Sequence, residues 1–127
     1  MHLEVVTPQG TAVSTEADEV TAPGIRGEFG VLPGHTPFLT ALKPGVLTWK
    51  SQGSRGVIAV SAGFAEVSGK DQVIVLTQSA AAPEKIDEAE AKREIEDAEQ
   101  KLKDARTVEL ELKRDWARAK LDARAAK

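Results

Sequence analysis

The chain changes character within residues 80–91, which read Ala-Ala-Ala-Pro-Glu-Lys-Ile-Asp-Glu-Ala-Glu-Ala. This stretch holds Pro83, the last of six prolines, and all ten glycines precede it. Residues 1–83 carry 12 charged side chains, whereas residues 84–127 carry 25. A single uniform globule does not account for this asymmetry, so we expect one domain over 1–83 and a second over 84–127.

Upstream of this stretch, the sequence predicts short β-strands joined by tight turns. Apolar and polar residues alternate with a period of two, and turn residues interrupt them at short intervals. The expected strands are 3–7, 20–22, 38–42, 46–50, 57–60, 63–67 and 72–77. Short strands in this number must fold over into a sandwich or closed barrel to bury their inner faces. The strand at 72–77 is almost continuously apolar, so we expect it to be central.

Downstream of Pro83, the sequence predicts helix. Ala, Glu, Lys, Arg and Leu dominate residues 84–127, and acidic residues fill the expected first turn at 84–88. One apolar stripe runs Ile95, Ala98, Leu102, Ala105, and a second runs Leu112, Trp116, Ala119, Ala123. Because the first stripe fails at Glu109, we expect two helices of about 20 residues with a joint near 104–109. The fold class is therefore α+β: an N-terminal all-β sandwich followed by a C-terminal antiparallel two-helix hairpin.

The charges favour folding the two helices against each other. Residues 84–106 carry a net charge of −3 and residues 107–127 a net charge of +2. The joint contains neither Gly nor Pro, however, so the segment could also run straight as one rod of roughly 60 Å. Either an ordinary static hairpin or an arm with folded and extended states is consistent with the pattern.

Composition excludes several classes of protein. The chain has no cysteine, which removes disulfide scaffolds, thiolate zinc sites and cysteine nucleophiles. The longest aliphatic runs are four residues, far short of the roughly 20 that span a membrane. A net charge of −3 gives no electrostatic reason to expect nucleic acid as a partner.

No catalytic constellation or metal-ligand pattern stands out. The glycine-rich run 24–30 has the density of a phosphate loop, but Val31-Leu32-Pro33-Gly34 follows it instead of a helix. His2 and His35 lack the spacing of a metal pair, and Glu28, expected in the most irregular loop, has no acid–base partner in view. We therefore expect a non-catalytic protein without cofactor or metal that acts through contacts.

The stretch 23–37, Pro-Gly-Ile-Arg-Gly-Glu-Phe-Gly-Val-Leu-Pro-Gly-His-Thr-Pro, resembles the epsilon subunits of F-type ATP synthase. The segments 39–45 and 63–67 match in order and spacing, and the charged tail occupies the position of that family's helical hairpin. The resemblance covers essentially the whole chain. It implies a subunit without an active site in the rotor's central stalk, which transmits torque between proton flow and ATP synthesis.

The resemblance also implies partners. The sandwich would bind the gamma subunit and rest on the polar loops of the membrane c-ring, with contacts from Glu28, Phe29 and His35. The hairpin would extend along gamma into the catalytic head and block ATP hydrolysis. We expect a monomer when isolated, peripheral on the cytoplasmic face of a bacterial membrane, without direct membrane insertion.

Two details of the tail refine these expectations. The second helix would carry the inhibitory role through its basic residues, which are Lys113, Arg114, Arg118, Lys120, Arg124 and Lys127. Ile86 and Asp87 match the start of a nucleotide-binding motif found in several bacterial members, but Glu90 stands where that motif has arginine. Because a carboxylate repels phosphate, we expect weak or absent ATP binding.

One alternative from another class stays open. The chain could be a small ligand-binding β-sandwich module whose helical tail forms oligomers. The interruption at Glu109 argues against a continuous coiled coil, which needs three or more intact heptads.

Overall fold

The alternating segment before Pro83 forms strands, as its period predicts. The computed structural model describes residues 1–126. Its strands are β1 (His2–Thr7), β2 (Gly10–Glu16), β3 (Glu19–Gly24), β4 (Gly27–Val31), β5 (Phe38–Leu42), β6 (Gly45–Ser51), β7 (Ser54–Val60), β8 (Gly63–Ser68), β9 (Gln72–Thr77) and β10 (Ala80–Ala81).

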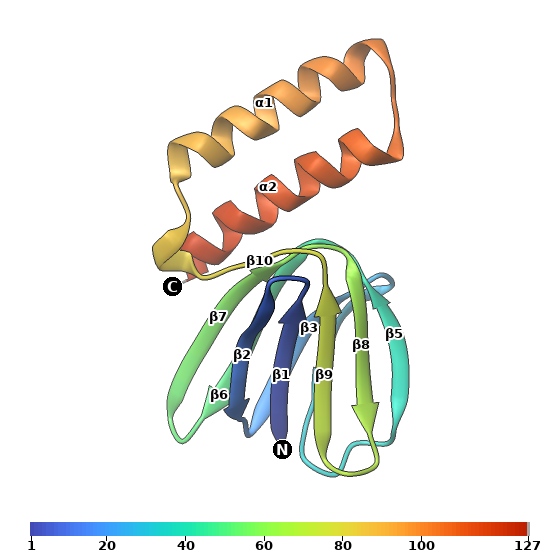
Figure 1. Ribbon diagram of the computed structural model, residues 1–127, viewed down its shortest axis with the longest axis vertical. Coiled ribbons are helices and arrows are strands. Elements are labelled where there is room, and N and C mark those ends of the chain that lie inside the picture. Colours follow the sequence, from blue (N-terminus) through green and yellow to red (C-terminus); the bar gives the residue numbers. More distant parts are fainter. Residues whose placement is uncertain (127) are drawn as a thin grey trace.

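The strands join in the order β10-β7-β6-β3-β5-β8-β9-β1-β2, and β4 pairs with β3 outside this path. Neighbours are antiparallel except β1 and β9, which run parallel although they lie near opposite ends of the β segment. The sheet folds over on itself and encloses a common interior (Figure 1). Strand β9 lies between β8 and β1, so its predicted central place is confirmed.

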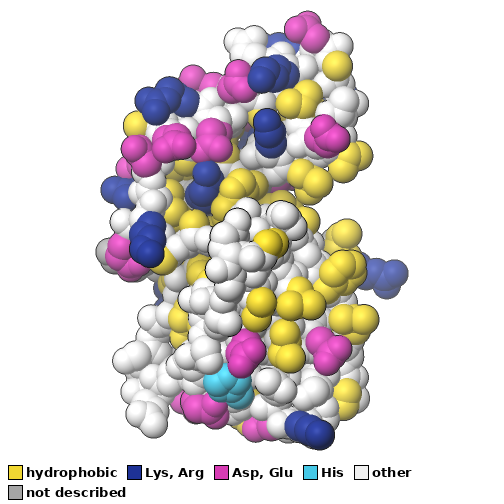
Figure 2. Space-filling view, viewed as in Figure 1, with side chains coloured by type: hydrophobic (Ala, Val, Ile, Leu, Met, Phe, Trp, Pro, Cys, Tyr) yellow, Lys and Arg dark blue, Asp and Glu magenta, His cyan; other side chains and the backbone are white. Residues whose placement is uncertain are grey.

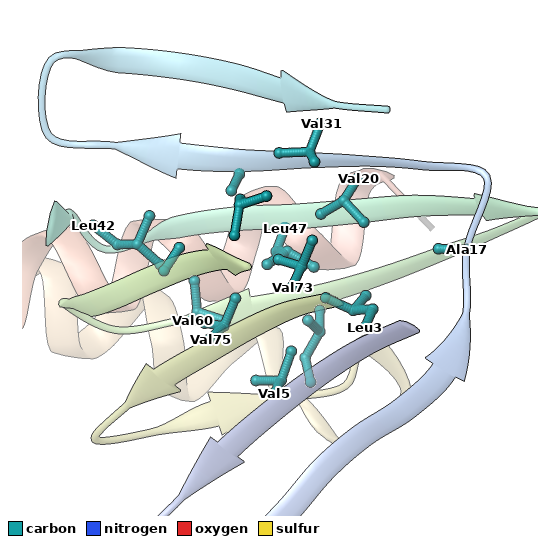
Figure 3. Close-up of a cluster of buried hydrophobic side chains, with 14 residues drawn as sticks. Leu3, Val5, Ala17, Val20, Val31, Leu42, Leu47, Val60, Val73 and Val75 are labelled. Carbon is teal, nitrogen blue, oxygen red and sulfur yellow. The ribbon is translucent and has the colours of Figure 1, made fainter. Parts of the chain in front are cut away.

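The interior of the sandwich consists of aliphatic side chains from alternate strand positions. In β1 and β9 every second residue is buried, which places Leu3, Val5, Val73 and Val75 in the same layer. Side chains from β3, β4, β6 and β7 meet them from other directions (Figure 3). The fully buried aliphatic residues of largest volume are Leu3, Val5, Val20, Val31, Leu42, Leu47, Val60, Val73 and Val75.

The segment after Pro83 forms a short 3₁₀ turn, η1 (Pro83–Lys85), and two helices, α1 (Glu88–Asp104) and α2 (Val108–Ala126). The joint at 105–107 breaks the helix without Gly or Pro. Ala105 is extended, at φ −151° and ψ 111°. Thr107 then caps α2, because its Oγ1 accepts a hydrogen bond of 3.2 Å from the Leu110 N–H. The predicted α+β fold with an antiparallel hairpin is confirmed.

The hairpin folds back so that α2 lies on the sandwich and α1 lies outside α2 (Figure 1). Ile86 and Ala123 are buried against Ala59 of β7, and Trp116 packs at the edge of this cluster. Of the predicted stripe, Ala98, Leu102, Ala119 and Ala123 are buried. Ala105 and Leu112 are exposed, because both lie near the joint beyond the contact area.

Three local predictions were wrong. Strand β2 lies outside the predicted strands, because its Thr and Ser residues give no apolar alternation. Glu28 lies in strand β4 rather than in an irregular loop, since the glycines around it accommodate a tight hairpin. Helix α1 begins at Glu88 rather than at Glu84, because Asp87 supplies the N-cap: its Oδ1 accepts a 3.0 Å hydrogen bond from the Glu90 N–H.

Candidate functional site

The glycine-rich run forms a tight β3–β4 hairpin. Gly24 pairs with Gly27 across the turn, and Gly27 has a φ of +132° that favours glycine. A Cβ on Gly24 would approach the Gly27 carbonyl oxygen to 2.7 Å, so this close contact also requires glycine. The glycines thus serve backbone geometry, and no helix follows them to cradle a phosphate.

Beside this hairpin lies an open groove of about 710 Å³. It is lined by residues 24–30 of the β3–β4 hairpin, by His35, and by residues 38–41 of β5. The three residues predicted as stalk contacts, Glu28, Phe29 and His35, therefore share one groove. We call this surface the β4 groove.

Three aromatic rings that line the β4 groove contact one another. The rings of Phe29 and Phe38 meet edge to face with centroids 5.3 Å apart. The His35 ring lies 5.1 Å from the same Phe38 ring, and its Nδ1 donates to the Thr36 carbonyl oxygen at 2.6 Å. Gly34 N–H donates to Asp71 Oδ1 at 3.1 Å, which ties the loop before His35 to the β8–β9 turn. The groove is therefore a preformed surface.

The chemistry of the β4 groove is that of a contact surface. Arg26 and Glu28 are exposed, and within residues 1–126 neither side chain makes a hydrogen bond or ion pair. Groups of His, Asp or Glu able to hold a metal ion do not occur in the described part of the chain. The groove offers two charged groups and aromatic edges to a partner.

The outer face of β5, β8 and β9 carries large exposed hydrophobic side chains. Leu39, Phe64 and Leu76 are 67%, 56% and 53% exposed. Phe64 pairs with Leu76 across β8 and β9, and Leu39 also lines the β4 groove. Figure 2 shows hydrophobic side chains gathered over these strands. We call this surface the outer apolar face, and it adjoins the β4 groove.

The outer apolar face is not predicted from the sequence, although strand β9 carries one signal of it. The continuous apolar run in β9 predicts a central strand, and it is also consistent with an apolar outer face. In the structure Val73 and Val75 point into the core, whereas Leu76 points outward. A strand that is apolar on both faces in an antiparallel sheet indicates that something else covers its outer face.

The predicted inhibitory residues lie along α2, and most of them make contacts in the folded hairpin. Lys113 is exposed, and Arg114 pairs with the adjacent Asp115 at 3.1 Å. Arg118, Lys120 and Arg124 turn toward α1, where each pairs with a glutamate. Lys127 lies outside the described residues.

The residues at the predicted nucleotide-binding positions have structural roles in the folded chain. Ile86 is 5% exposed and packs against Ala59 and Ala123. Its carbonyl oxygen accepts a 2.9 Å hydrogen bond from Arg124 Nη1, and Asp87 caps α1. Glu90 is exposed in the first turn of α1, where its charge adds to that of Glu88.

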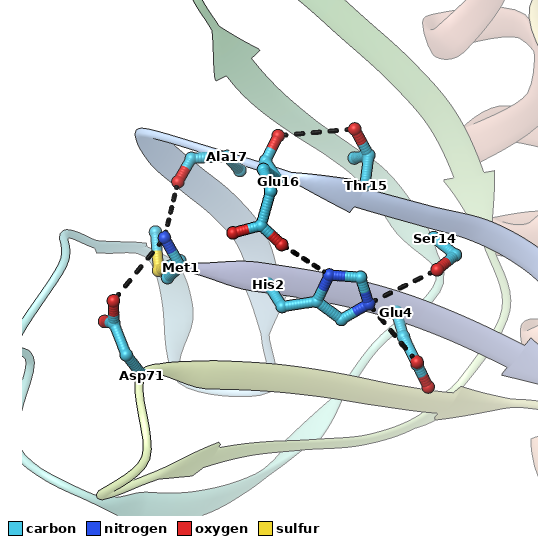
Figure 4. Close-up of polar contacts among 8 residues, drawn as sticks. All are labelled: Met1, His2, Glu4, Ser14, Thr15, Glu16, Ala17 and Asp71. Atoms are coloured by element: carbon cyan, nitrogen blue, oxygen red, sulfur yellow. Dashed lines mark hydrogen bonds and ion pairs between the residues drawn. The ribbon is translucent and has the colours of Figure 1, made fainter.

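A polar cluster joins the ends of β1 and β2 (Figure 4). His2 Nδ1 lies 2.6 Å from Glu16 Oε2, and its Nε2 lies 3.3 Å from Glu4 Oε1 and 3.2 Å from Ser14 Oγ. The hydrogen bond to Glu16, helped by Glu4, raises the pKa of His2 above its usual 6.5. The Met1 ammonium lies 3.5 Å from Asp71 Oδ2, which ties β1 to the β8–β9 turn.

A second shifted group lies at the start of the hairpin. The hydrogen bond and charge of Lys92, with a further contribution from Arg124, lower the pKa of Glu88.

Within the described residues, neither α1 nor α2 combines the length and the apolar character that a membrane-spanning helix needs.

Several known proteins that are similar in sequence to this chain are ATP synthase epsilon chains. Residues 1–83 match the family described as "ATP synthase, Delta/Epsilon chain, beta-sandwich domain". The ATP synthase epsilon chain of Nitratidesulfovibrio vulgaris strain DP4 is 46% identical over 119 residues, covering 94% of this chain and 84% of that protein. The ATP synthase epsilon chain of Geotalea uraniireducens is 42% identical over 134 aligned positions, covering 100% of this chain and 96% of that protein.

Solved structures with a similar fold come from rotary assemblies. A chain in the Euglena gracilis mitochondrial ATP synthase, resolved with OSCP, F1 and the c-ring, superposes with a TM-score of 0.83 at 26% identity, covering 98% of this chain and 80% of that one. A chain in the Tetrahymena thermophila central stalk and c-ring shares the fold, with a TM-score of 0.57, 14% identity and coverage of 67% and 68%.

Proposed function

The chain belongs to the family of ATP synthase epsilon chains, and we propose that it is a non-catalytic subunit of the rotating central stalk. In this role it couples rotation of the proton-driven c-ring to ATP synthesis. One observation carries the proposal: a rigid sandwich presents two adjoining contact surfaces, the β4 groove and the outer apolar face. The subunit is peripheral, on the cytoplasmic face of a bacterial membrane.

The two surfaces differ in chemistry, and we assign each to a different partner. The outer apolar face exposes Leu39, Phe64 and Leu76, and burying these side chains in a lasting interface is favourable. This property suits the gamma subunit, which stays attached throughout rotation. The β4 groove presents Arg26 and Glu28, and these charges suit the polar loops of the c-ring.

Binding of gamma is tested by placing a charge on the outer apolar face. We expect Phe64→Glu to weaken co-purification with gamma by about 100-fold, because a carboxylate would be buried without a partner. Val108→Glu is the matched control, since Val108 is 72% exposed at the hairpin tip and outside this face. Equal binding of gamma by both variants would overturn the assignment.

The c-ring contact is tested in membrane vesicles that hold the assembled complex. Glu28→Lys reverses the charge in the β4 groove without touching the core. We expect the variant to assemble but to lose part of the coupling between ATP hydrolysis and proton pumping. Glu109→Lys is the control, because it makes the same charge reversal at an exposed position near the hairpin tip, outside both surfaces of the sandwich. Normal coupling in Glu28→Lys would contradict a c-ring contact at this residue.

The hairpin supplies the second part of the proposal, inhibition of ATP hydrolysis through α2. Its docking on the sandwich involves few large side chains, which suits an arm that can leave. Glu90 would repel phosphate, and Ile86 and Asp87 are already engaged in packing and in capping α1. These observations support a hairpin whose folded or extended state does not depend on ATP. Isothermal titration of the isolated chain should detect no micromolar ATP binding, and such binding would refute this point.

The alternative of a ligand-binding module with an oligomerising tail is less well supported. The stripe on α2 that would form a coiled coil is used within the chain, where Trp116 and Ala123 pack on the sandwich. Size-exclusion chromatography with light scattering should therefore give a monomer. A stable dimer would favour the alternative.

A further inference from the structure

Three cations of α2 are neutralised by three carboxylates of α1. The pairs and their N···O distances are Arg118–Glu99 at 2.8 Å, Lys120–Glu94 at 2.8 Å and Arg124–Glu88 at 3.5 Å. From one pair to the next, the residue number of the cation increases while that of the glutamate decreases, as expected for antiparallel helices. We call this set of pairs the charge ladder.

The apolar contact between the two helices is thin. The buried side chains of α1 and α2 are Ala91, Ala98, Leu102, Ala117, Ala119 and Ala123. Five of these six are alanine, and an alanine side chain removes little apolar area from water. Since apolar attraction is weak here, even the modest contribution of the charge ladder matters for holding α1 against α2.

Lys120 shows how the ladder connects to the sandwich. Its Nζ binds Glu94 of α1 and lies 5.5 Å from the centroid of the Trp116 ring. Trp116 in turn packs against the buried cluster that includes Ala59 of the sandwich. Loss of the ion pair with Glu94 therefore loosens the Lys120 side chain, whose cation–π contact stabilises the docked Trp116 ring.

We propose that α1 is an internal acidic partner that masks the cations of α2 and so sets the strength of inhibition by this subunit. The proposal rests on the inhibitory role of α2 proposed above. Arg118, Lys120 and Arg124 bind either the glutamates of α1 or an external surface, but not both. The external partner is a protein surface with carboxylates spread over about 9 Å, the rise of six helical residues.

The charge ladder thereby tunes an equilibrium between a folded and an open hairpin. A partner shifts this equilibrium only by the difference between its affinities for the two states. Exposed ion pairs are individually weak, so the ladder biases the hairpin without locking it. Loss of the three carboxylates should raise the open fraction roughly tenfold.

The test compares two triple variants in the assembled ATP synthase complex. Glu88→Gln, Glu94→Gln and Glu99→Gln together remove the ladder carboxylates. The control, Glu90→Gln, Glu96→Gln and Asp97→Asn, removes three charges from exposed positions of the same helix that do not contact α2. We expect the ladder variant to hydrolyse ATP about threefold to tenfold more slowly than the wild type, and the control to match the wild type.

A second readout follows the hairpin without relying on inhibition. Because the chain has no cysteine, nitroxide labels can be attached at Arg93→Cys on α1 and Asp122→Cys on α2. In the isolated full chain, the ladder variant should show an increased population with long label separations, whereas the control should not. A chain truncated after Ala82 reports separately whether the tail inhibits at all.

These measurements separate the two proposals. If truncation leaves hydrolysis unchanged while the labels move apart in the ladder variant, the inhibitory function fails and the ladder still controls the hairpin. If truncation raises hydrolysis while the ladder variant behaves as its control in both readouts, masking by α1 is refuted.

Discussion

The sandwich and the hairpin are stabilised by different kinds of side chain. The interior of the sandwich consists mainly of Leu and Val residues, many of them fully buried, that come from strands far apart in the sequence. The hairpin buries mainly alanine and adds ion pairs at its surface. Free energy from burial grows with apolar area, whereas exposed ion pairs contribute little and are screened by salt. The sandwich therefore suits a fixed adaptor, and the hairpin suits a movable arm.

The largest effect that this comparison predicts comes from Leu→Ala at a buried position of the sandwich, set against Leu→Ala at an exposed position of the hairpin. Leu47→Ala should lower the free energy of unfolding by about 2–5 kcal/mol, because Leu47 is fully buried and its loss leaves a cavity. Leu112→Ala in the exposed part of α2 should cost less than about 0.5 kcal/mol. Chemical denaturation measures both values, and similar costs would contradict the contrast between the two parts.

An intermediate effect is expected where the hairpin meets the sandwich. Trp116 is half-buried and is the largest α2 side chain that packs against the cluster of Ala59, Ile86 and Ala123. Trp116→Ala should weaken docking by about 1–2 kcal/mol. Amide hydrogen exchange should then accelerate in α1 and α2 but not in β9. Acceleration throughout the chain would indicate that the two parts unfold together.

The smallest effect concerns pH and the sandwich alone. The pKa of His2 is raised in the folded state, so its stabilising contacts are fully present below about pH 6.5 and are lost as pH rises through the raised pKa. The melting temperature of the wild type should exceed that of His2→Gln near pH 6, and the two should converge near pH 9. His35 contacts no carboxylate among the described residues, so His35→Gln should leave this pH dependence in place. A constant difference for His2→Gln across the range would refute the role of the His2 cluster.

The fold could be predicted from the sequence wherever a periodic pattern was strong. Alternation identified β1, β5, β6, β8 and β9, and the broken stripe at Glu109 identified the joint. Local capping decided the remaining boundaries: Asp87 and Thr107 set the starts of α1 and α2 through single hydrogen bonds that composition does not encode. Strand β4 is not predicted from the sequence, because two of its five residues, Gly27 and Gly30, have weak strand propensity.

The candidate site was predictable in part. Glu28, Phe29 and His35 were selected from the motif at 23–37, and the structure brings all three to one groove. The outer apolar face could not be located, because exposure of Phe64 and Leu76 depends on how β5, β8 and β9 align in the sheet. Their adjacency is a property of strand register, which a single sequence does not reveal.

The most direct test of a fixed adaptor carrying a movable arm is to assemble the ATP synthase complex with a chain that ends after Ala82. The measurement is the amount of this truncated chain in the purified complex, together with the rate of ATP hydrolysis. We predict that the truncated chain is present in the same proportion as the full chain and that hydrolysis rises severalfold. Loss of the truncated chain from the complex, or an unchanged hydrolysis rate, would contradict the account.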